Sequence, residues 1–413
     1  MALTFKEIWE QFSHVEFVRR LYLKRLKQDG TYEADFMEIS QGLMKDGSVR
    51  SLSRSLPNSS WRFGYVTVSN VNLDILSAFQ EFASENDPNS LFFGYVRNKS
   101  IIKVVDAFID KYTDPDAPVE ASVTTFEGLI DSRTATTQQG FETVTALDFL
   151  SVLNDINVSE ITLTETTMNA LIYEIMNRSE FTQYFNVSNS TDYINAGYNA
   201  SSIDTSVYTG SILEMMQDLA KGHSIFYVDP TDNYFYFKPA EPTSAVQYEF
   251  LEQNNRKLDI SNYREGVDRQ ITNWYWDDSS VSISSEAFPA PVTKISESFK
   301  IDGITNNTQR QNLLDYLVTR TQDAKPYFRL QLPYFPVIKL LDKVVVQSFG
   351  SAPRDAVRWG MFIYTSSSTT NPNTAPRWRK PAGIRISSDN LWMVRSIQHD
   401  ANLKTTVELE KIL

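Results

Sequence analysis

The chain has 413 residues, more than one ordinary hydrophobic core holds, and this length favours two to four packed units. Hydrophobic residues make up 41% of it and aromatic residues 13%, which is enough apolar surface for several cores and excludes a mainly disordered chain. Cysteine is absent, which excludes disulfides, thiolate nucleophiles and cysteine-ligated metals and indicates assembly in a reducing cytosol.

The charge balance is acidic, with 39 Lys and Arg against 51 Asp and Glu and a net charge of -12. Proteins that hold DNA stably need a basic surface to displace counterions, so this balance disfavours a stable nucleic-acid complex. The first ten residues lack the basic and apolar regions of a secretory signal, and no run approaches the roughly 18 apolar residues of a membrane helix. We therefore expect a protein without a membrane partner.

The first 150 residues are predicted to form mainly strands. Branched and aromatic residues over 14–26 and 31–39 flank the turn Gln28-Asp29-Gly30, which predicts a hairpin. Further runs of strand composition follow at 61–68, 91–105 and 122–131. Apolar residues recur at three-residue steps in two stretches, where we expect short helices, at 71–82 and 147–156.

Residues 159–219 are predicted to be mostly helical. The segment opens with a stripe of apolar residues at helical spacing, made of Met168, Leu171, Ile172, Ile175 and Met176. Such a stripe is more typical of a packed core than of a cofactor site. Ser211 is then predicted to cap a second helix over 212–220, which Gly222 ends.

The last part of the chain returns to strand patterns. The run 224–229, a turn at 230–233 and the run 234–238 predict a tight hairpin fed by the preceding helix. One further helix is predicted at 309–321. The other segments have strand composition: 270–276, 280–284, 291–299, 326–331, 343–347, 361–365, 391–398 and 405–413.

Two β-rich blocks thus flank a helical one, and the predicted fold class is α+β, dominated by β structure. We expect a first β domain with short helices at 1–157, a mainly helical insert at 158–223, and a second β domain at 224–413 that includes the helix 309–321. No fixed-period repeat is present, which disfavours solenoids and propellers.

The three histidines give no sign of a metal or catalytic site. His14, His223 and His399 fall in different blocks without a second ligand at metal spacing. His223 follows Gly222 at a predicted helix end, where we interpret it as a cation on the helix terminus rather than a general base. His399 is expected in a hairpin turn.

Paired carboxylates are the remaining candidates for chemistry. The pairs are Asp277 with Asp278, Asp114 with Asp116, and Asp229 with Asp232. Any of them could serve a glycosidase, but each lies in a turn-like context where Asp is favoured for backbone hydrogen bonding. The triplet Asp204-Thr205-Ser206 resembles an aspartic-protease motif without its Gly, and no phosphate-binding glycine loop occurs. We expect no enzyme, no cofactor and no metal.

The one basic concentration is predicted to be a partner-contact loop. It consists of Arg377, Trp378, Arg379 and Lys380. Cations interleaved with an aromatic ring also suit stacking on nucleic acid. In an acidic, proline-interrupted context we favour contact with an acidic neighbouring subunit.

Short motifs in chain order resemble the hub proteins of bacteriophage tail tips and baseplates. They lie at 21–25 with 29–33, 89–94, 211–220 with 226–229 and 234–237, and 391–400 with 405–412. The resemblance implies a homotrimer in which each subunit contributes two similar β-barrel-like tube domains, braced by peripheral helices. Three chains would then form a ring of pseudo-sixfold symmetry that matches a hexameric tail tube.

The resemblance also implies the partners and the location. The ring would join a distal tail or tail tube protein and the tape measure protein to a central spike or fibre, in a virion tail tip assembled in the host cytoplasm. DNA would only pass through its lumen. Two alternatives stay open: a tail-associated carbohydrate-active enzyme, such as a lysin or depolymerase that uses one of the Asp pairs, and a receptor-binding protein.

Overall fold

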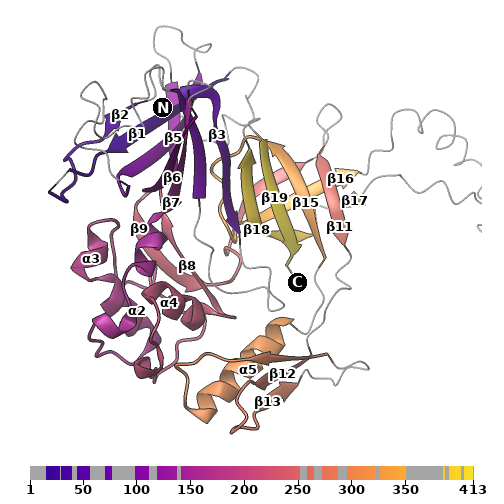
Figure 1. The fold of residues 1–413 in the computed structure, drawn as a ribbon. Coiled ribbons are helices and arrows are strands. Elements are labelled where there is room, and N and C mark those ends of the chain that lie inside the picture. Colours follow the sequence, from indigo (N-terminus) through magenta and orange to yellow (C-terminus); the bar gives the residue numbers. More distant parts are fainter. Residues whose placement is uncertain are drawn as a thin grey trace, which may run out of the picture.

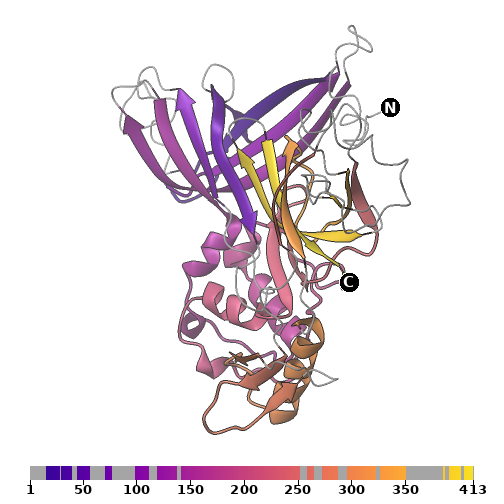
Figure 2. The same ribbon diagram turned by 90° about the vertical axis from the view of Figure 1, so that its right-hand side faces the viewer.

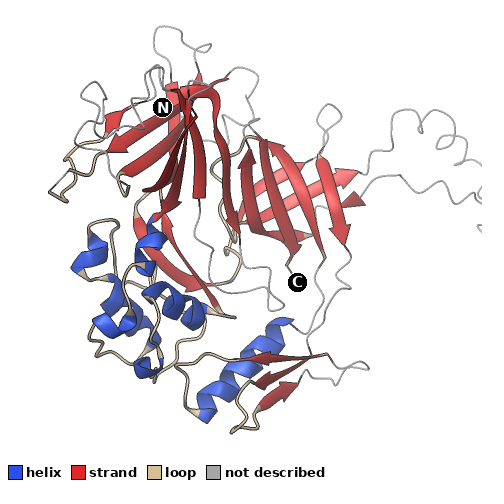
Figure 3. Cartoon of the chain, viewed as in Figure 1, coloured by secondary structure: helices blue, strands red, loops and turns tan. Residues whose placement is uncertain are grey.

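A computed structural model describes most of the chain. The described residues are 15–27, 29–39, 44–55, 70–76, 98–110, 119–136, 141–251, 258–264, 272–286, 295–321, 326–349, 385–386, 390–400 and 404–412. The fold is α+β and dominated by strands, as predicted. Figure 3 separates the two kinds of element, with two strand-rich lobes in its upper half and the helices below them.

The first β lobe is a seven-stranded antiparallel sheet (Figure 1, indigo to violet). Its strands are β1 (Val15–Lys24), β2 (Met37–Glu38), β3 (Met44–Ser55), β4 (Asn70–Leu76), β5 (Ile101–Asp110), β6 (Val119–Thr136) and β7 (Phe141–Asp148). They pair in the order β2-β1-β5-β6-β7-β4-β3. Alternate residues such as Leu21, Leu23, Ile102 and Val104 point into one buried cluster, because successive strand side chains face opposite sides.

Most of the strands predicted for this lobe are confirmed. The predicted hairpin exists as β1 paired with β2, and Gly30 has the positive φ of +84° that its turn requires. The strand predicted at 122–131 lies within β6, and the one at 91–105 coincides with β5 from residue 101 onward. The strand predicted at 61–68 lies outside the described residues.

The helix predicted at 71–82 is wrong over 71–76, which form most of β4. This strand is hydrogen-bonded on both sides, to β3 and to β7, and Val71 and Leu73 are fully buried while Asn72 between them is not. A period of two, set by the neighbouring strands, therefore overrides the three-residue spacing that suggested a helix. The helix predicted at 147–156 is shorter, a 3-10 helix at Phe149–Asn154 that follows β7.

A helical region with one hairpin lies below the lobes (Figure 1). Its helices are η2 (Phe149–Asn154), η3 (Val158–Glu160), α2 (Met168–Met176), α3 (Ser179–Thr182), η4 (Thr205–Val207) and α4 (Ile212–Ala220), and its hairpin is β8 (Ser224–Asp229) with β9 (Tyr234–Pro239). The predicted Ser211 cap is a capping box with Glu214, and Gly222 ends the helix with a φ of +77°.

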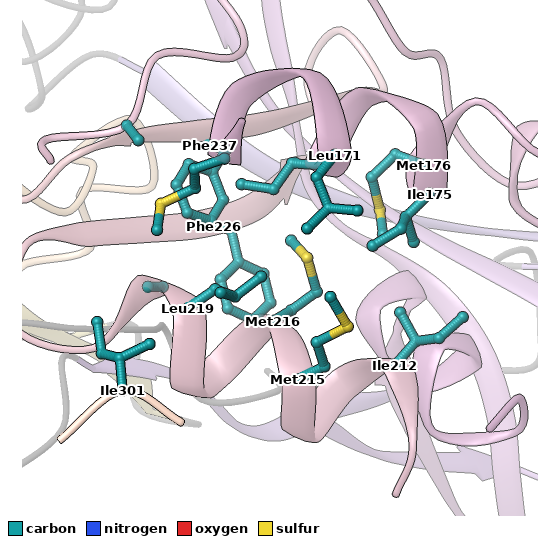
Figure 4. Close-up of a cluster of buried hydrophobic side chains, with 14 of the residues drawn as sticks. Leu171, Ile175, Met176, Ile212, Met215, Met216, Leu219, Phe226, Phe237 and Ile301 are labelled. Atoms are coloured by element: carbon teal, nitrogen blue, oxygen red, sulfur yellow. The ribbon is translucent and has the colours of Figure 1, made fainter. Parts of the chain in front are cut away.

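The core of this region is built from the predicted apolar stripe. The five stripe residues of α2 are fully buried and lie in one cluster with Met215, Met216 and Leu219 of α4 and with Phe226 and Phe237 of the hairpin. Figure 4 shows the labelled members of this cluster, among them Leu171 and Met216, filling the space between α2, α4 and the hairpin. The stripe is therefore core.

A smaller α5 unit joins the same cluster from the far end of the molecule. It comprises β12 (Asn273–Trp276), β13 (Ser284–Glu286), β14 (Ser296–Phe299) and α5 (Asn307–Thr321). The predicted helix buries one apolar face there, made of Leu313, Leu314, Leu317 and Val318. The helix starts two residues earlier than predicted, because the Oδ1 of Asn306 accepts hydrogen bonds from the backbone N–H groups of residues 308 and 309.

The second β lobe curves around a core of its own. Its strands are β10 (Val246–Leu251), β11 (Asp259–Arg264), β15 (Tyr327–Pro333), β16 (Lys343–Phe349), β17 (Arg385–Ile386), β18 (Leu391–Asp400) and β19 (Lys404–Lys411). The order is β10-β16-β18-β19-β15-β11, and β10 with β16 is the parallel pair in this order. Phe250 at one end and Ile260 at the other contact the same buried cluster, so the sheet is curled rather than flat.

The predicted domain ranges 1–157, 158–223 and 224–413 stay a prediction. The buried clusters group the residues by packing, with the hairpin after residue 223 and the α5 unit sharing the core of the helical region. Among the described residues, no helix has both the length and the apolar character that crossing a bilayer requires.

We predict that Phe226→Ala lowers the free energy of unfolding by about 3–5 kcal/mol, because it leaves a cavity in a fully buried cluster. Tyr275→Ala is the control, since this ring is 43% exposed on β12, and it should cost less than about 1 kcal/mol. Urea denaturation of both variants measures the difference, and equal losses would contradict the assignment of this core.

Candidate functional site

The two β lobes are joined into one sheet by strand β18. The first half of this strand, residues 391–393, pairs with β16 of its own lobe, whereas residues 396–400 pair with residues 55–51 of β3 in the first lobe. Its other edge pairs along its length with β19. The junction is therefore made by backbone hydrogen bonds as well as by side chains, and it is the candidate functional site.

A buried charged group lies at this junction. Arg19 of β1 and Asp106 of β5 are opposite each other in the register and point to the buried face, where their side chains are 7% and 0% exposed. The Nε of Arg19 donates to Asp106 Oδ1 at 2.6 Å, and its Nη2 donates to the hydroxyl of Tyr334 at 2.8 Å. That hydroxyl in turn donates to Asp106 Oδ2. Tyr334 comes from the second lobe, so each lobe completes the hydrogen bonding of the other.

Electrostatics keep Arg19 and Tyr334 each in one protonation state. Burial acts to lower the pKa of Arg19, but the charge of Asp106 and the hydrogen bonds to it raise the pKa above its ordinary value. Burial, followed by the charge of Asp106, raises the pKa of Tyr334 far above its ordinary value. At neutral pH the guanidinium is therefore charged and the phenol is neutral and able to donate.

Aromatic and hydroxyl groups surround the triad. The ring of Tyr334 meets Phe17 of the first lobe and His399 of β18 edge-on, at centroid distances of 5.3 and 5.1 Å. Thr405 Oγ1 accepts a hydrogen bond from the backbone N–H of Phe335 at 2.8 Å and lies 2.9 Å from His399 Nδ1. These contacts fix the segment that carries Tyr334 against the start of β19.

A cavity of about 310 Å³ lies beside the triad, where both lobes meet the β8–β9 hairpin. Leu52 of β3 and Ile397 of β18 line it from the joined strands, and residues 122–125 of β6 line it from the first lobe. Asp229 at the end of β8 and Lys339 of the second lobe form an ion pair of 2.5 Å in its wall. The hairpin is thereby tied to the lobe junction.

A second carboxylate, that of Asp342, contacts the backbone of the same lysine. The backbone N–H of Lys339 donates to Asp342 Oδ2 at 2.7 Å. Burial raises the pKa of Asp342 to about 6, and the negative charge of Asp229 contributes to the increase against the opposing effect of Lys339. The pKa of Asp229 is lowered, because Lys339 and the N–H of Thr231 outweigh its burial. Asp342 is therefore a group at this junction whose pKa lies near 6.

The histidines differ from their predicted environments. His223 is fully buried, and burial lowers its pKa to about 3, so the interpretation as a helix-end cation is wrong and the ring is neutral. Its Nδ1 lies 2.6 Å from Ser224 Oγ and accepts from the backbone N–H of Tyr198. His399 is a buried residue of β18 rather than part of a turn. His14 lies outside the described residues.

Asp278 and Asp232, one from each described carboxylate pair, stabilise turns. Asp278 accepts from the N–H and hydroxyl of Ser280, and Asp232 accepts from the N–H of Tyr234. Asp204 does the same with Ser206. Within the described ranges no three His, Asp or Glu residues gather as a metal site would require. Asp114, Asp116 and the predicted partner-contact loop of Arg377, Trp378, Arg379 and Lys380 lie outside the described residues.

Comparison with known proteins identifies the fold. No protein-family model matches the chain, and no curated protein matches it. The crystal structure of a tail protein from Neisseria meningitidis aligns with 95% of this chain and 96% of its own, at 9% identity and a TM-score of 0.51. This chain has a tail-protein fold. The resemblance to phage tail proteins seen in the sequence is thus confirmed at the level of the fold.

Two other solved structures align over similar lengths. The 43 kDa tail protein of prophage MuSo2 from Shewanella oneidensis aligns with 96% of this chain and 98% of its own, at 10% identity and a TM-score of 0.48. A prophage tail protein from Listeria monocytogenes aligns over 95% and 94%, at 9% identity and a TM-score of 0.49.

The sequence interpretation missed the triad of this tail-protein fold. Arg19, Asp106 and Tyr334 are separated by 87 and 228 positions, so no local motif connects them. One signal was available. Asp106 falls in phase with Ile102 and Val104 of β5, which point into the core of the first lobe. A charge in phase with core residues needs a buried partner.

We predict that Asp106→Ala lowers the free energy of unfolding by about 3–5 kcal/mol, because it leaves the Arg19 charge buried without its carboxylate. Glu120→Ala is the matched control. It breaks an ion pair with Arg20, the residue after Arg19 in β1. The side chains of Arg20 and Glu120 are 28% and 33% exposed, so the variant should lower the free energy of unfolding by less than about 1 kcal/mol. Chemical denaturation compares them, and a similar cost for both would contradict the role of the triad.

A second prediction concerns pH. Since the pKa of Asp342 is raised to about 6, its protonated form favours the folded chain fully below about pH 4, and this contribution is lost as the pH rises through 6. Asp342→Asn keeps an oxygen for the Lys339 N–H and cannot ionise. The variant should gain on the order of 2 kcal/mol over the wild type between pH 4 and 7 in thermal or urea unfolding. The same pH dependence of the free energy of unfolding in both proteins would contradict this prediction.

Proposed function

We propose that this chain is the structural hub of a phage tail tip or baseplate. In this proposal three copies form a ring that adapts a hexameric tail tube to a threefold central spike or fibre. The observation that carries the proposal is the pairing of β18 with β3, which makes two curved lobes of one chain into a single continuous sheet. The tail-protein fold supports the same conclusion.

Two joined lobes per chain suit this geometry. Three chains supply six lobes, and the triad of Arg19, Asp106 and Tyr334 holds the two lobes of each chain at one angle. The helical region and the α5 unit extend from one side of both lobes in both views (Figures 1 and 2). In a ring of lobes these parts would be peripheral braces, and the lobes would form the wall.

The proposed partners follow from the position of such a ring. A distal tail or tail tube protein and the tape measure protein would lie above it, and a spike or fibre below, in the virion tail tip after assembly in the host cytoplasm. Three chains of net charge -12 carry a total of -36. An acidic lumen repels the phosphate backbone, which suits transient passage of DNA rather than binding.

A catalytic role is not favoured by the described carboxylates. Asp204, Asp232 and Asp278 accept hydrogen bonds from backbone N–H groups of their own turns, which is a structural use. We therefore propose a non-enzymatic protein rather than a lysin or depolymerase.

Mass and shape test the proposal together. Light scattering of the purified full chain should give three times the chain mass of 47.3 kDa, and negative-stain images should show an annulus with a central opening. A compact monomer at every concentration, without annular particles, would contradict the hub.

A further inference from the structure

A groove with polar and apolar lining residues lies in the helical region, away from the residues that join the lobes. It has a volume of about 560 Å³ and runs between α2 and the segment 189–194. Asn169, Tyr173 and Glu174 line it from the helix, and Asn189 and Thr191 line it from the opposite segment. Its volume falls within the range of small-molecule sites.

The polar groups on the helix side are held in place from behind. The carboxylate of Glu174 accepts from the backbone N–H groups of residues 164 and 165 at 3.0 and 2.9 Å, and from the Thr164 hydroxyl at 2.7 Å. Burial acts to raise the pKa of Glu174, but these hydrogen bonds outweigh it and lower the pKa, so the group is a charged acceptor at neutral pH. Its position does not depend on a ligand.

Asn169 is fixed in the same way but offers the opposite function. Its backbone N–H donates to Asn199 Oδ1 at 3.1 Å, and its own Oδ1 accepts from the backbone N–H of Ala196 at 2.9 Å. Because the oxygen is engaged, the amide NH₂ is the group that Asn169 presents for other contacts. A donor and an acceptor are thus both preorganised on one helix face.

The chemistry of the lining selects one class of ligand. No Lys or Arg lines the groove, and its carboxylates would repel phosphates and uronates. The described residues hold no group of three metal-ligating carboxylates or histidines, which disfavours a cation site here. The lining instead offers amides, hydroxyls, the two carboxylates of Glu165 and Glu174, one tyrosine ring and two apolar side chains. These groups match a neutral molecule with many hydroxyls and an apolar face.

We propose that this groove binds a neutral saccharide. Glu174, which three protein donors already reach, accepts from one sugar hydroxyl, and the NH₂ of Asn169 donates to another. The ring of Tyr173 packs against the carbon face of a sugar unit. Asn189 and Thr191 close the groove from the other side. The inference does not depend on the hub, because all these residues belong to the helical region of one chain.

Saturation-transfer NMR on the full chain tests it. The probes are neutral oligomers of glucose, galactose and N-acetylglucosamine, with polygalacturonate oligomers as the anionic comparison. We expect at least one neutral probe to bind at millimolar concentration or below and the anionic probe not to bind. Absence of binding by every neutral probe, or equal binding of the anionic probe, would overturn the proposal.

Variants locate the bound sugar. Asn189→Ala and Tyr173→Ala should each weaken the binding neutral probe at least tenfold. Asn177→Ala is the matched control, an exposed amide at the end of α2 outside the lining, and it should bind like the wild type. Because Tyr173 also packs on the core, the exposed Asn189 decides the outcome if Tyr173→Ala unfolds. Unchanged binding by Asn189→Ala would overturn the assignment, whereas ring formation tests only the hub.

Discussion

The hydrogen-bonded edge between β3 and β18 is the constraint on which the rest of the molecule depends. The edge strand of an open sheet presents unpaired N–H and C=O groups, which another strand can complete. Here each lobe completes an edge of the other. Residues 51–55 belong to β3, the edge strand of the first lobe, and they pair with residues 396–400 of β18, which extend beyond the residues that pair with β16. Strand pairing fixes the register to one residue, because a slip of one would turn Leu52 and Ile397 out of their clusters.

The remaining parts attach to this joined sheet without interrupting it. The chain leaves the second lobe after β11, builds the α5 unit, and returns as β15, which pairs directly with β11 at residues 259 and 331. The α5 unit packs on the helical region, and that region contacts the second lobe through Ile225, Leu341 and Met393. The Asp229–Lys339 ion pair adds a polar contact at the same boundary. The helical region and the α5 unit thus share one core.

Local signals in the sequence predicted local structure well, and distant contacts lay beyond them. Ser211 and Glu214 specify the start of α4 by hydrogen bonds within three residues, and Gly222 specifies its end by a positive φ, so both ends could be predicted. The helix predicted at 71–82 was wrong over β4, because pairing with β3 and β7 determines the conformation of this segment rather than the spacing of its own apolar residues. The interpretation of His223 was also wrong, since its neutral state comes from burial, which the local sequence does not show. The candidate site consists of such contacts throughout, so only the in-phase charge of Asp106 could have indicated it.

The triad at the junction contributes more to geometry than to net stability. Burying an ion pair carries a desolvation cost that often cancels its attraction, and well-packed apolar residues can stabilise a fold equally. An apolar junction, however, tolerates small shifts, because dispersion has no preferred direction. Arg19 and Asp106 also bond each other directly, but the Tyr334 hydroxyl can accept from the first and donate to the second only for one placement of the second lobe. We infer that the triad sets the angle between the lobes, the quantity that a closed ring of such lobes would require to be constant.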